Sequence, residues 1–294
     1  QAIYRLLQDH YDLYFADAKK DSIHPDIPMK RRHQIPLATA PEFAEEVRKI
    51  VSELGISLLI PGVDEELLKL TNMKGGDSDF KILIPSAKYV SVMLDKLDSM
   101  RKLANEGLEA PNTEQIENSN WSHYPCIVKP RYGRGSRGFQ ILNSIEQVTR
   151  YTDYLRTTEE QFVIQEMLKG MEYSVLMAAD QQSRLHAVVP VLIRTKKGIT
   201  IEGVTDKNQD VINACVEIHS TFPAKGCYNI QLIQTNDGRI VPFEINPRVS
   251  TTFCLGLAAD VDPIDIFMTN VEPTNLHSFT VGLELRRYWS NSIL

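Results

Sequence analysis

Apolar positions in the first third of the chain show helical spacing in some segments and short continuous runs, typical of buried strands, in others. Phe43, Val47 and Val51 recur every fourth residue, which predicts an amphipathic helix over residues 42–54. Gly55 suits the end of this helix because glycine readily adopts the left-handed conformation. The other predicted elements are a helix over residues 2–9, strands over 13–17, 56–61 and 81–85, a polar connection over 18–36, a short helix after the turn at 62–66, and a flexible loop over 75–79. This alternation of strands and helices predicts a parallel α/β sheet.

The α/β pattern begins within a helix, although such domains ordinarily begin with a strand. We therefore expect a Rossmann-like domain over residues 1–94 whose first strand is missing here. The apolar spacing of residues 89–106 predicts one long helix that ends at Gly107. We place the domain boundary near residue 95, so that residues 95–294 form the second domain.

The second domain combines apolar strands with two further helices. Its predicted strands cover residues 124–130, 162–168, 170–177, 187–194, 198–203, 228–234 and 239–245, and its helices cover 145–155 and 209–222. A tight turn at residues 236–238 is typical of a hairpin and joins the last two strands.

The last of these strands ends in a polar pattern within the sequence GRIVPFEINPRVS. Glu244, Asn246 and Arg248 occupy every second position, so a strand would point all three side chains to one face. A carboxylate and an amide oxygen suit Mg²⁺, and an arginine suits a carboxylate or a phosphate. A strand end whose polar residues simply meet solvent is the alternative explanation.

A glycine-rich segment follows the strand over residues 124–130. It reads RYGRGSRG and holds three glycines and three arginines in eight residues. Such turns expose backbone N–H groups to anions, which indicates a cover over a phosphate. Lys129 interrupts the apolar strand just before it, and a lysine in that place needs an anion or water. A hairpin turn with solvated arginines is the alternative.

Composition and charge exclude several classes of protein. The length of 294 residues suits about two domains. A net charge of −6 gives no basic field that would attract nucleic acid, so we expect no nucleic-acid partner. There is neither a long apolar run nor a signal-peptide pattern, which predicts a cytoplasmic protein without a membrane partner. The four cysteines form no CxxC or CxxH pattern and predict buried thiols rather than disulfides or a zinc site.

Four segments together resemble the ATP-grasp superfamily, and within it the branch of the carbamoyl-phosphate synthase large subunit and biotin carboxylase. They read DKLDSMRKLANEGLEAPNT, YPCIVKPRYGRGSRG, VIQEMLKGMEYSV and YNIQLIQTNDGRIVPFEINPRVS, and they follow the family's order within residues 40–275. The resemblance implies an ATP-grasp fold, in which two α+β subdomains grip ATP, preceded by a Rossmann-like pre-ATP-grasp domain. It makes residues 124–167 the lid subdomain.

The resemblance also implies which residues contact the nucleotide. They are Lys96, Lys129, Tyr132, Gly133, Gly135, Ser136, Gly138, Glu166, Met167, Leu168, Glu172 and Gln231. Within this set the lysines hold the phosphates, residues 132–138 cover them, the residues around Glu166 read the adenine, and Glu172 binds the ribose.

The resemblance further implies a metal site and catalytic residues. The implied magnesium ligands are Gln231, Glu244 and Asn246, with Mn²⁺ as an alternative ion. Many relatives carry an acid where this chain has Gln231. Arg248 would contact the transferred phosphoryl group, and Lys129 would stabilise its charge.

Further candidates come from the strands and turns around this constellation. We expect Arg194 or Lys196, on the strand VLIRTKKG, to face the cleft and bind an acidic substrate or a phosphate. Residues 250–252 are candidates for a substrate-binding turn, and Asp260 and Asp262 for pairing with an amine. Solvated side chains are the alternative for each.

The activity implied by the resemblance is ATP-dependent ligation of a carboxylate to an amine through an acyl-phosphate, which releases ADP and phosphate. One alternative is phosphorylation of a carboxylate or carbamate, as in carbamoyl-phosphate synthase. The other is a catalytically silent nucleotide-binding protein. The expected cofactors are ATP and Mg²⁺, and the expected partners are a small carboxylate and an amine, with a homodimer left open.

Overall fold

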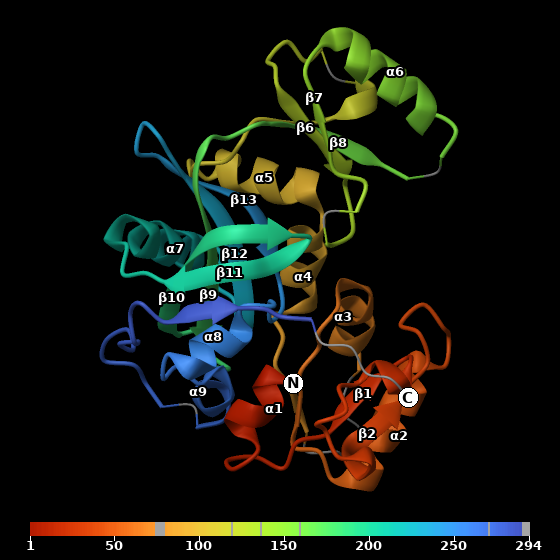
Figure 1. Cartoon of the computed structure of the whole chain (residues 1–294), viewed down its shortest axis with the longest axis vertical. Helices are drawn as coiled ribbons and strands as arrows, with labels where there is room; N and C mark the ends of the chain where they lie inside the picture. The colour runs from red at the N-terminus through yellow and green to blue at the C-terminus, as the bar shows by residue number, and fades with distance from the viewer. Residues whose placement is uncertain (74–79, 119, 136, 159, 270, 290–294) are drawn as a thin grey trace.

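An antiparallel six-stranded sheet lies at the centre of the protein (Figure 1). The computed structural model describes residues 1–73, 80–118, 120–135, 137–158, 160–269 and 271–289. In spatial order the central strands are β13 (Ile240–Asn246), β12 (Gly226–Thr235), β9 (Gly170–Ala179), β10 (Leu185–Lys197), β11 (Ile199–Thr205) and β14 (Glu284–Arg286). All five neighbouring pairs are antiparallel.

Alternate residues of the central strands point to two differently covered faces. Tyr173, Val175 and Met177 pack under α4 (Ala87–Leu94), α5 (Lys96–Asn105) and α7 (Gln209–Thr221). Leu176 and Ala178 lie on the other face, against α8 (Phe253–Ala258) and α9 (Pro263–Thr269). Both faces are therefore buried at this level, which explains why β9 is apolar along most of its length.

A smaller four-stranded sheet lies beyond α5, at the top of Figure 1. Its spatial order is β5 (Thr113–Gln115), β8 (Phe162–Glu166), β6 (Cys126–Pro130) and β7 (Gln140–Leu142), with antiparallel neighbours. η3 (Ile116–Asn118) and α6 (Ile145–Leu155) complete this unit, and an apolar cluster that includes Val128, Leu155 and Ile164 fills its core. This unit overlaps residues 124–167, whose assignment as a lid subdomain stays a prediction, and it also includes β5 and η3 from before them.

The amino-terminal part is built from short elements whose strands pair in parallel, as the sequence predicts, but they form two separate two-stranded sheets rather than one parallel sheet. β1 (Phe15–Asp17) pairs with β2 (Arg32–Gln34), and β3 (Leu58–Leu59) pairs with β4 (Lys81–Ile82). The other elements of this part are α1 (Ala2–Leu7), η1 (Lys20–Ser22), η2 (Met29–Arg31), α2 (Phe43–Leu54) and α3 (Asp64–Thr71). Gly55 ends α2 with φ 62°, as expected.

Two predictions for this region need correction. The polar connection over residues 18–36 contains β2, which no apolar pattern marks because none of its residues is buried. The long helix over residues 89–106 is wrong, because Asp95 adopts φ −90° and ψ 106° and separates α4 from α5. The predicted loop over residues 75–79 lies outside the described residues. The domain boundary near residue 95 coincides with this break and stays a prediction.

The close approach of β9 to β12 generates a test of the packing. A Cβ atom at Gly170 would lie 2.0 Å from the backbone oxygen of Gln234, and backbone cannot give way as a flexible side chain can. We expect Gly170→Ala to lower the free energy of unfolding by about 2 kcal/mol or more, measured by urea denaturation. Gly62→Ala is the control, because a Cβ at Gly62 would meet nothing within 4 Å. Equal stability of the two variants would contradict this packing.

Candidate active site

The hairpin of β12 and β13 presents three oxygen-bearing side chains on one face of the central sheet. Gln231 lies directly opposite Glu244 in the strand register, and Asn246 follows on the same face. Asn246 is only 6% exposed. Within the described part of the chain, neither the Glu244 carboxylate nor the Asn246 amide has a hydrogen-bond partner, so both oxygens are available to a ligand.

Lys129 approaches this hairpin from β6 of the smaller sheet. Its ammonium is 3.4 Å from the backbone oxygen of Phe243 and 5.6 Å from the centre of the Phe243 ring. Burial lowers the pKa of Lys129 to about 8, the charge of Glu244 opposes this shift, and the charges of Lys96 and Lys196 add to it. The structure therefore buries a lysine at the place where the sequence suggests a phosphate contact.

Lys196 joins the same cluster from β10. Its ammonium lies 2.5 Å from an oxygen of Glu172 and 2.9 Å from the amide oxygen of Gln231, and it is 5.6 Å from the centre of the Phe243 ring. Lys196 thus connects Glu172 on β9 with Gln231 on β12 of the hairpin.

Arg194 does not join the cluster. Its side chain is 48% exposed and pairs with Glu284 on β14 at 2.6 Å. The register of β10 shifts between Ile193 and Thr195 and again between Thr195 and Lys196. Because these irregularities break the simple alternation of a strand, Lys196 reaches the cleft and Arg194 does not. The expectation that Arg194 faces the cleft is therefore corrected.

A small cavity lies between the side chains of Glu244 and Asn246 and the start of α5. It is lined by Asp64, Met93, Leu94, Lys96, Gly133, Glu244, Ile245 and Asn246. Lys96 is the first residue of α5, and its ammonium donates to the backbone oxygen of Gly133 at 2.6 Å. The cavity thus has a lysine and the glycine-rich segment on one side and the oxygen donors of β13 on the other.

Arg248 also contacts this region, through a partner that the sequence did not single out. Its Nε donates to Asp64 at 2.5 Å and its Nη1 to the backbone oxygen of Val249 at 3.0 Å. Asp64 lies in the first turn of α3, among the residues Asp64, Glu65 and Glu66. An acidic run at a helix start ordinarily matches the helix dipole, so this run carried no signal for a site.

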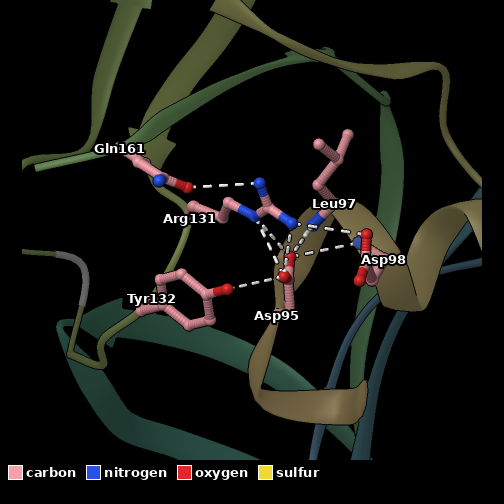
Figure 2. Close-up of polar contacts among 6 residues, drawn as sticks. All are labelled: Asp95, Leu97, Asp98, Arg131, Tyr132 and Gln161. Atoms are coloured by element: carbon pink, nitrogen blue, oxygen red, sulfur yellow. Dashed lines mark hydrogen bonds and ion pairs between the residues drawn. The ribbon is translucent and has the colours of Figure 1, made fainter. Parts of the chain in front are cut away.

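Tyr132, which the resemblance implies as part of the phosphate cover, directs its hydroxyl at a carboxylate. Figure 2 shows its hydroxyl pointing at Asp95, to which it donates at 2.8 Å, beside a two-pronged contact from Arg131 to the same carboxylate. Asp95 and Arg131 are absent from the residues predicted for the site. A helix-breaking Asp next to Lys96 could have indicated them, because aspartate is favoured at helix starts.

The remaining residues of the glycine-rich segment form its turn. Gly133, Gly135 and Gly138 have φ of 109°, 70° and 68°, values that other residues rarely adopt. Gly135 lies against the turn between β10 and β11, because a Cβ at Gly198 would be 3.3 Å from its oxygen. Ser136 lies outside the described residues.

The segment implied to read adenine lies at the end of β8. The Glu166 carboxylate accepts from the backbone N–H of Asn112 at 3.3 Å. Met167 and Leu168 connect β8 to β9, and the described residues provide no hydrogen bond to their backbone. The backbone N–H and C=O groups of this connection are therefore available to hydrogen-bond a ligand.

The oxygen atoms of Glu244 and Asn246 fit a magnesium ion that is also coordinated by a bound ligand. Within the described ranges, no group of three or more His, Cys, Asp or Glu side chains is placed to hold a metal. Glu244 and Asn246 nevertheless line one cavity. Mg²⁺ in proteins is commonly held by one or two carboxylates together with phosphate oxygens and water. The residues present would therefore suffice only with a phosphate-bearing ligand.

Other candidates have partners elsewhere. Ser250 and Thr252 bond to each other at 2.7 Å, Asp262 accepts from Tyr11, and Asp260 accepts from Thr280. The four cysteines are free and buried, as predicted. In the parts that the structure describes, no helix is both long and apolar enough to cross a membrane.

Comparison with known proteins connects this geometry to a family. A family model described as an ATP-grasp domain matches residues 93–252. The chain is similar to the carbamoyl phosphate synthase large chain of Vibrio cholerae, at 28% identity over 181 residues that cover 54% of this chain and 17% of that protein. It is similar to the formate-dependent phosphoribosylglycinamide formyltransferase of Bifidobacterium adolescentis, at 21% identity over 248 residues that cover 74% of this chain and 61% of that protein. It thus spans less than two thirds of either relative.

Among solved structures, the chain is similar to the biotin carboxylase domain of the Hydrogenobacter thermophilus 2-oxoglutarate carboxylase, in complex with MgADP and bicarbonate. The TM-score is 0.71 at 14% identity, and the match covers 94% of this chain and 69% of that one. At this identity the likeness concerns the fold alone, and it confirms the fold class expected from the sequence.

The depressed pKa of Lys129 generates a test of its burial. A lysine whose folded pKa is about 8 is charged in both states at pH 7, so folding there carries the cost of burying the charge. Lys129→Met should therefore raise the free energy of unfolding at pH 7 by roughly 3 kcal/mol, since the pKa of Lys129 falls from 10.5 to about 8 and one pKa unit corresponds to about 1.4 kcal/mol. It should also remove a rise in stability between pH 8 and about 10.5, where only the unfolded lysine stays protonated.

Urea denaturation from pH 7 to 10 measures both effects. The exposed Lys102, changed to Met, is the control and should leave the pH dependence of unfolding unaltered. A Lys129→Met protein that is less stable than the wild type at pH 7 would show that the ammonium is not a buried, uncompensated charge.

Proposed function

The chain belongs to the ATP-grasp family, and we propose that it is an ADP-forming ligase that joins a carboxylate to an amine. One observation carries this proposal: Lys96 and Gly133 line the same small cavity as Glu244 and Asn246, with Lys129 beside the hairpin. Cations and backbone groups on one side and oxygen donors on the other suit a polyphosphate with its magnesium ion. The relatives described above support a nucleotide and a small carboxylate as ligands.

The proposed chemistry has two steps. A carboxylate oxygen attacks the γ-phosphorus of ATP, the bond to ADP breaks, and an acyl-phosphate forms. The nitrogen of an amine then attacks the acyl carbon, phosphate leaves with the electron pair of the C–O bond, and the nitrogen loses a proton. Glu244 and Asn246, joined by Gln231 once Lys196 releases its amide oxygen, would hold Mg²⁺, which supplies positive charge opposite the phosphates when bound.

The residues of this chain would position and stabilise these groups. Lys96 and Lys129 would hold the phosphates, and Arg248 would stabilise the charge on the moving phosphoryl group. Residues 166–168 would receive the adenine. Glu172 would bind the ribose after its contact with Lys196 breaks. The glycine turn at residues 133–138 would exclude water from the acyl-phosphate.

Phosphate release from ATP, measured with a panel of carboxylates with and without amines, tests the activity. Amine-dependent turnover supports the ligase. Turnover without an amine, with an acyl-phosphate trapped as a hydroxamate, would instead indicate a carboxylate kinase. Tight ATP binding with no turnover on any carboxylate would indicate a catalytically silent protein.

Glu244→Gln provides the sharpest prediction for this site. The substitution keeps the size of the side chain but removes the only carboxylate among the three proposed metal ligands. We expect kcat to fall by about 10²–10³-fold, because charge stabilisation at the phosphates is lost, while the melting temperature stays near that of the wild type.

The control is Glu217→Gln, at an exposed position on α7 outside the cavity. It should retain the wild-type rate. If Glu244→Gln turned over at the wild-type rate, Glu244 would have no role in holding the metal.

A further inference from the structure

Asp95 collects more hydrogen bonds than a helix cap requires. It is 3% exposed, and its Oδ1 accepts from the backbone N–H groups of Leu97 and Asp98 at 3.0 and 3.1 Å, which caps α5. The same carboxylate also accepts from Arg131 at 2.6–2.9 Å and from the Tyr132 hydroxyl at 2.8 Å. The cap is complete without these two side chains, so their convergence on Asp95 needs another explanation.

Arg131 connects this carboxylate to the smaller sheet. Its backbone N–H donates to the oxygen of Gln161 at 2.8 Å, and its Nη1 donates to the side-chain oxygen of Gln161 at 3.2 Å. Its own backbone oxygen accepts from the N–H of Lys96 at 3.1 Å. Figure 2 shows Arg131 lying between Gln161 and Asp95. The ion pair therefore fastens the end of β6 to the start of α5.

The two lysines of the cavity are the immediate neighbours of this ion pair. Lys96 follows Asp95 in the chain, and Lys129 precedes Arg131 by two residues. Gly133, the next residue but one after Arg131, accepts from the Lys96 ammonium. Any movement of Arg131 relative to Asp95 changes the separation of the two lysine backbones.

The burial of the Asp95–Arg131 pair also indicates that it fixes geometry rather than adding stability. Hydrogen bonds from Arg131 and Tyr132 outweigh the burial of Asp95 and keep its pKa below the usual range. A buried ion pair contributes little net stability, because both ions lose their water. Its value to this protein is therefore geometric.

From these contacts we propose that Asp95 is a positioning residue that, through Arg131 and Tyr132, sets the spacing of Lys96 and Lys129 that the phosphates of a nucleotide require. The inference rests on the proposed function only in that ATP is taken as the ligand. Asp95 is almost fully buried and would act through the two lysines.

Asp95→Asn tests this role with little change in shape. The amide keeps an oxygen for the cap of α5 but loses the charge that Arg131 needs. We expect the dissociation constant for MgATP, measured by calorimetry well below the melting temperature, to rise about tenfold, the order of effect expected for a lost charge-assisted contact. If turnover is detected, KM for ATP should rise with it, while kcat should change less because Arg248 and Glu244 are untouched.

The matched control is Asp98→Asn. Asp98 lies 3.4 Å from the same Arg131 but is 52% exposed, so its loss should change the dissociation constant less than twofold. Arg131→Gln alone should weaken ATP binding as Asp95→Asn does. The double variant should be no weaker than either single variant, since the two residues act as one unit.

The outcomes separate the two proposals. If the wild type fails to bind MgATP, the proposed function fails. If the wild type binds and Asp95→Asn binds equally well, or if the double variant shows additive losses, the positioning role is overturned. If Asp95→Asn does not fold, Tyr132→Phe decides, because it removes one hydroxyl and leaves the cap intact. A rise of about threefold in the dissociation constant would support the role, and no change would overturn it.

Discussion

Positive charge held in a confined, partly dry space is the constraint on which the site depends. Burial lowers the pKa of Lys129 to about 8, and the positive charges of Lys96 and Lys196 act on Lys129 in the same direction. Glu244 offsets only part of this, since its effect on Lys129 is smaller than that of burial. Under the proposed function, the polyphosphate of a nucleotide would supply negative charge next to these lysines and would offset the cost of burying Lys129.

The fold prevents the three lysines from moving apart. Lys96 begins α5, Lys129 lies on β6 of the smaller sheet, and Lys196 lies on β10 of the central sheet. The backbone of each lysine is held in its helix or strand. The three side chains therefore lie close together because α5, β6 and β10 lie close together. Figure 1 shows α5 lying between the two sheets, where a shift of one sheet against the other changes the lysine geometry. The Asp95–Arg131 pair lies where α5 meets the smaller sheet, next to Lys96 and two residues from Lys129, so the proposed positioning role concerns the lysines and not the oxygen donors of β13.

Local patterns in the sequence predicted the parts of the site that a single element determines. The alternation of Glu244 and Asn246 and the buried position of Lys129 follow from strand periodicity alone. Contacts between distant segments could not be predicted in this way. Arg248 meets Asp64 across 184 positions, and no spacing rule links the two. The bulges that turn Arg194 outward and the break at Asp95 depend on packing, which overrides the apolar pattern that made residues 89–106 look like one helix.

The amino-terminal part takes part in the site through the first turn of α3. Glu65 pairs with Arg134 of the glycine-rich segment, but both side chains are well exposed, so this contact has little energy. Asp64 differs, because it and Arg248 are both largely buried and Arg248 is fixed through two of its nitrogens. Among the described residues, the Nη2 of Arg248 has no partner. The guanidinium is therefore oriented by two protein oxygens and retains one nitrogen with which to meet an anion. Since Asp64 also lines the cavity, the amino-terminal part shapes the place where that anion would lie.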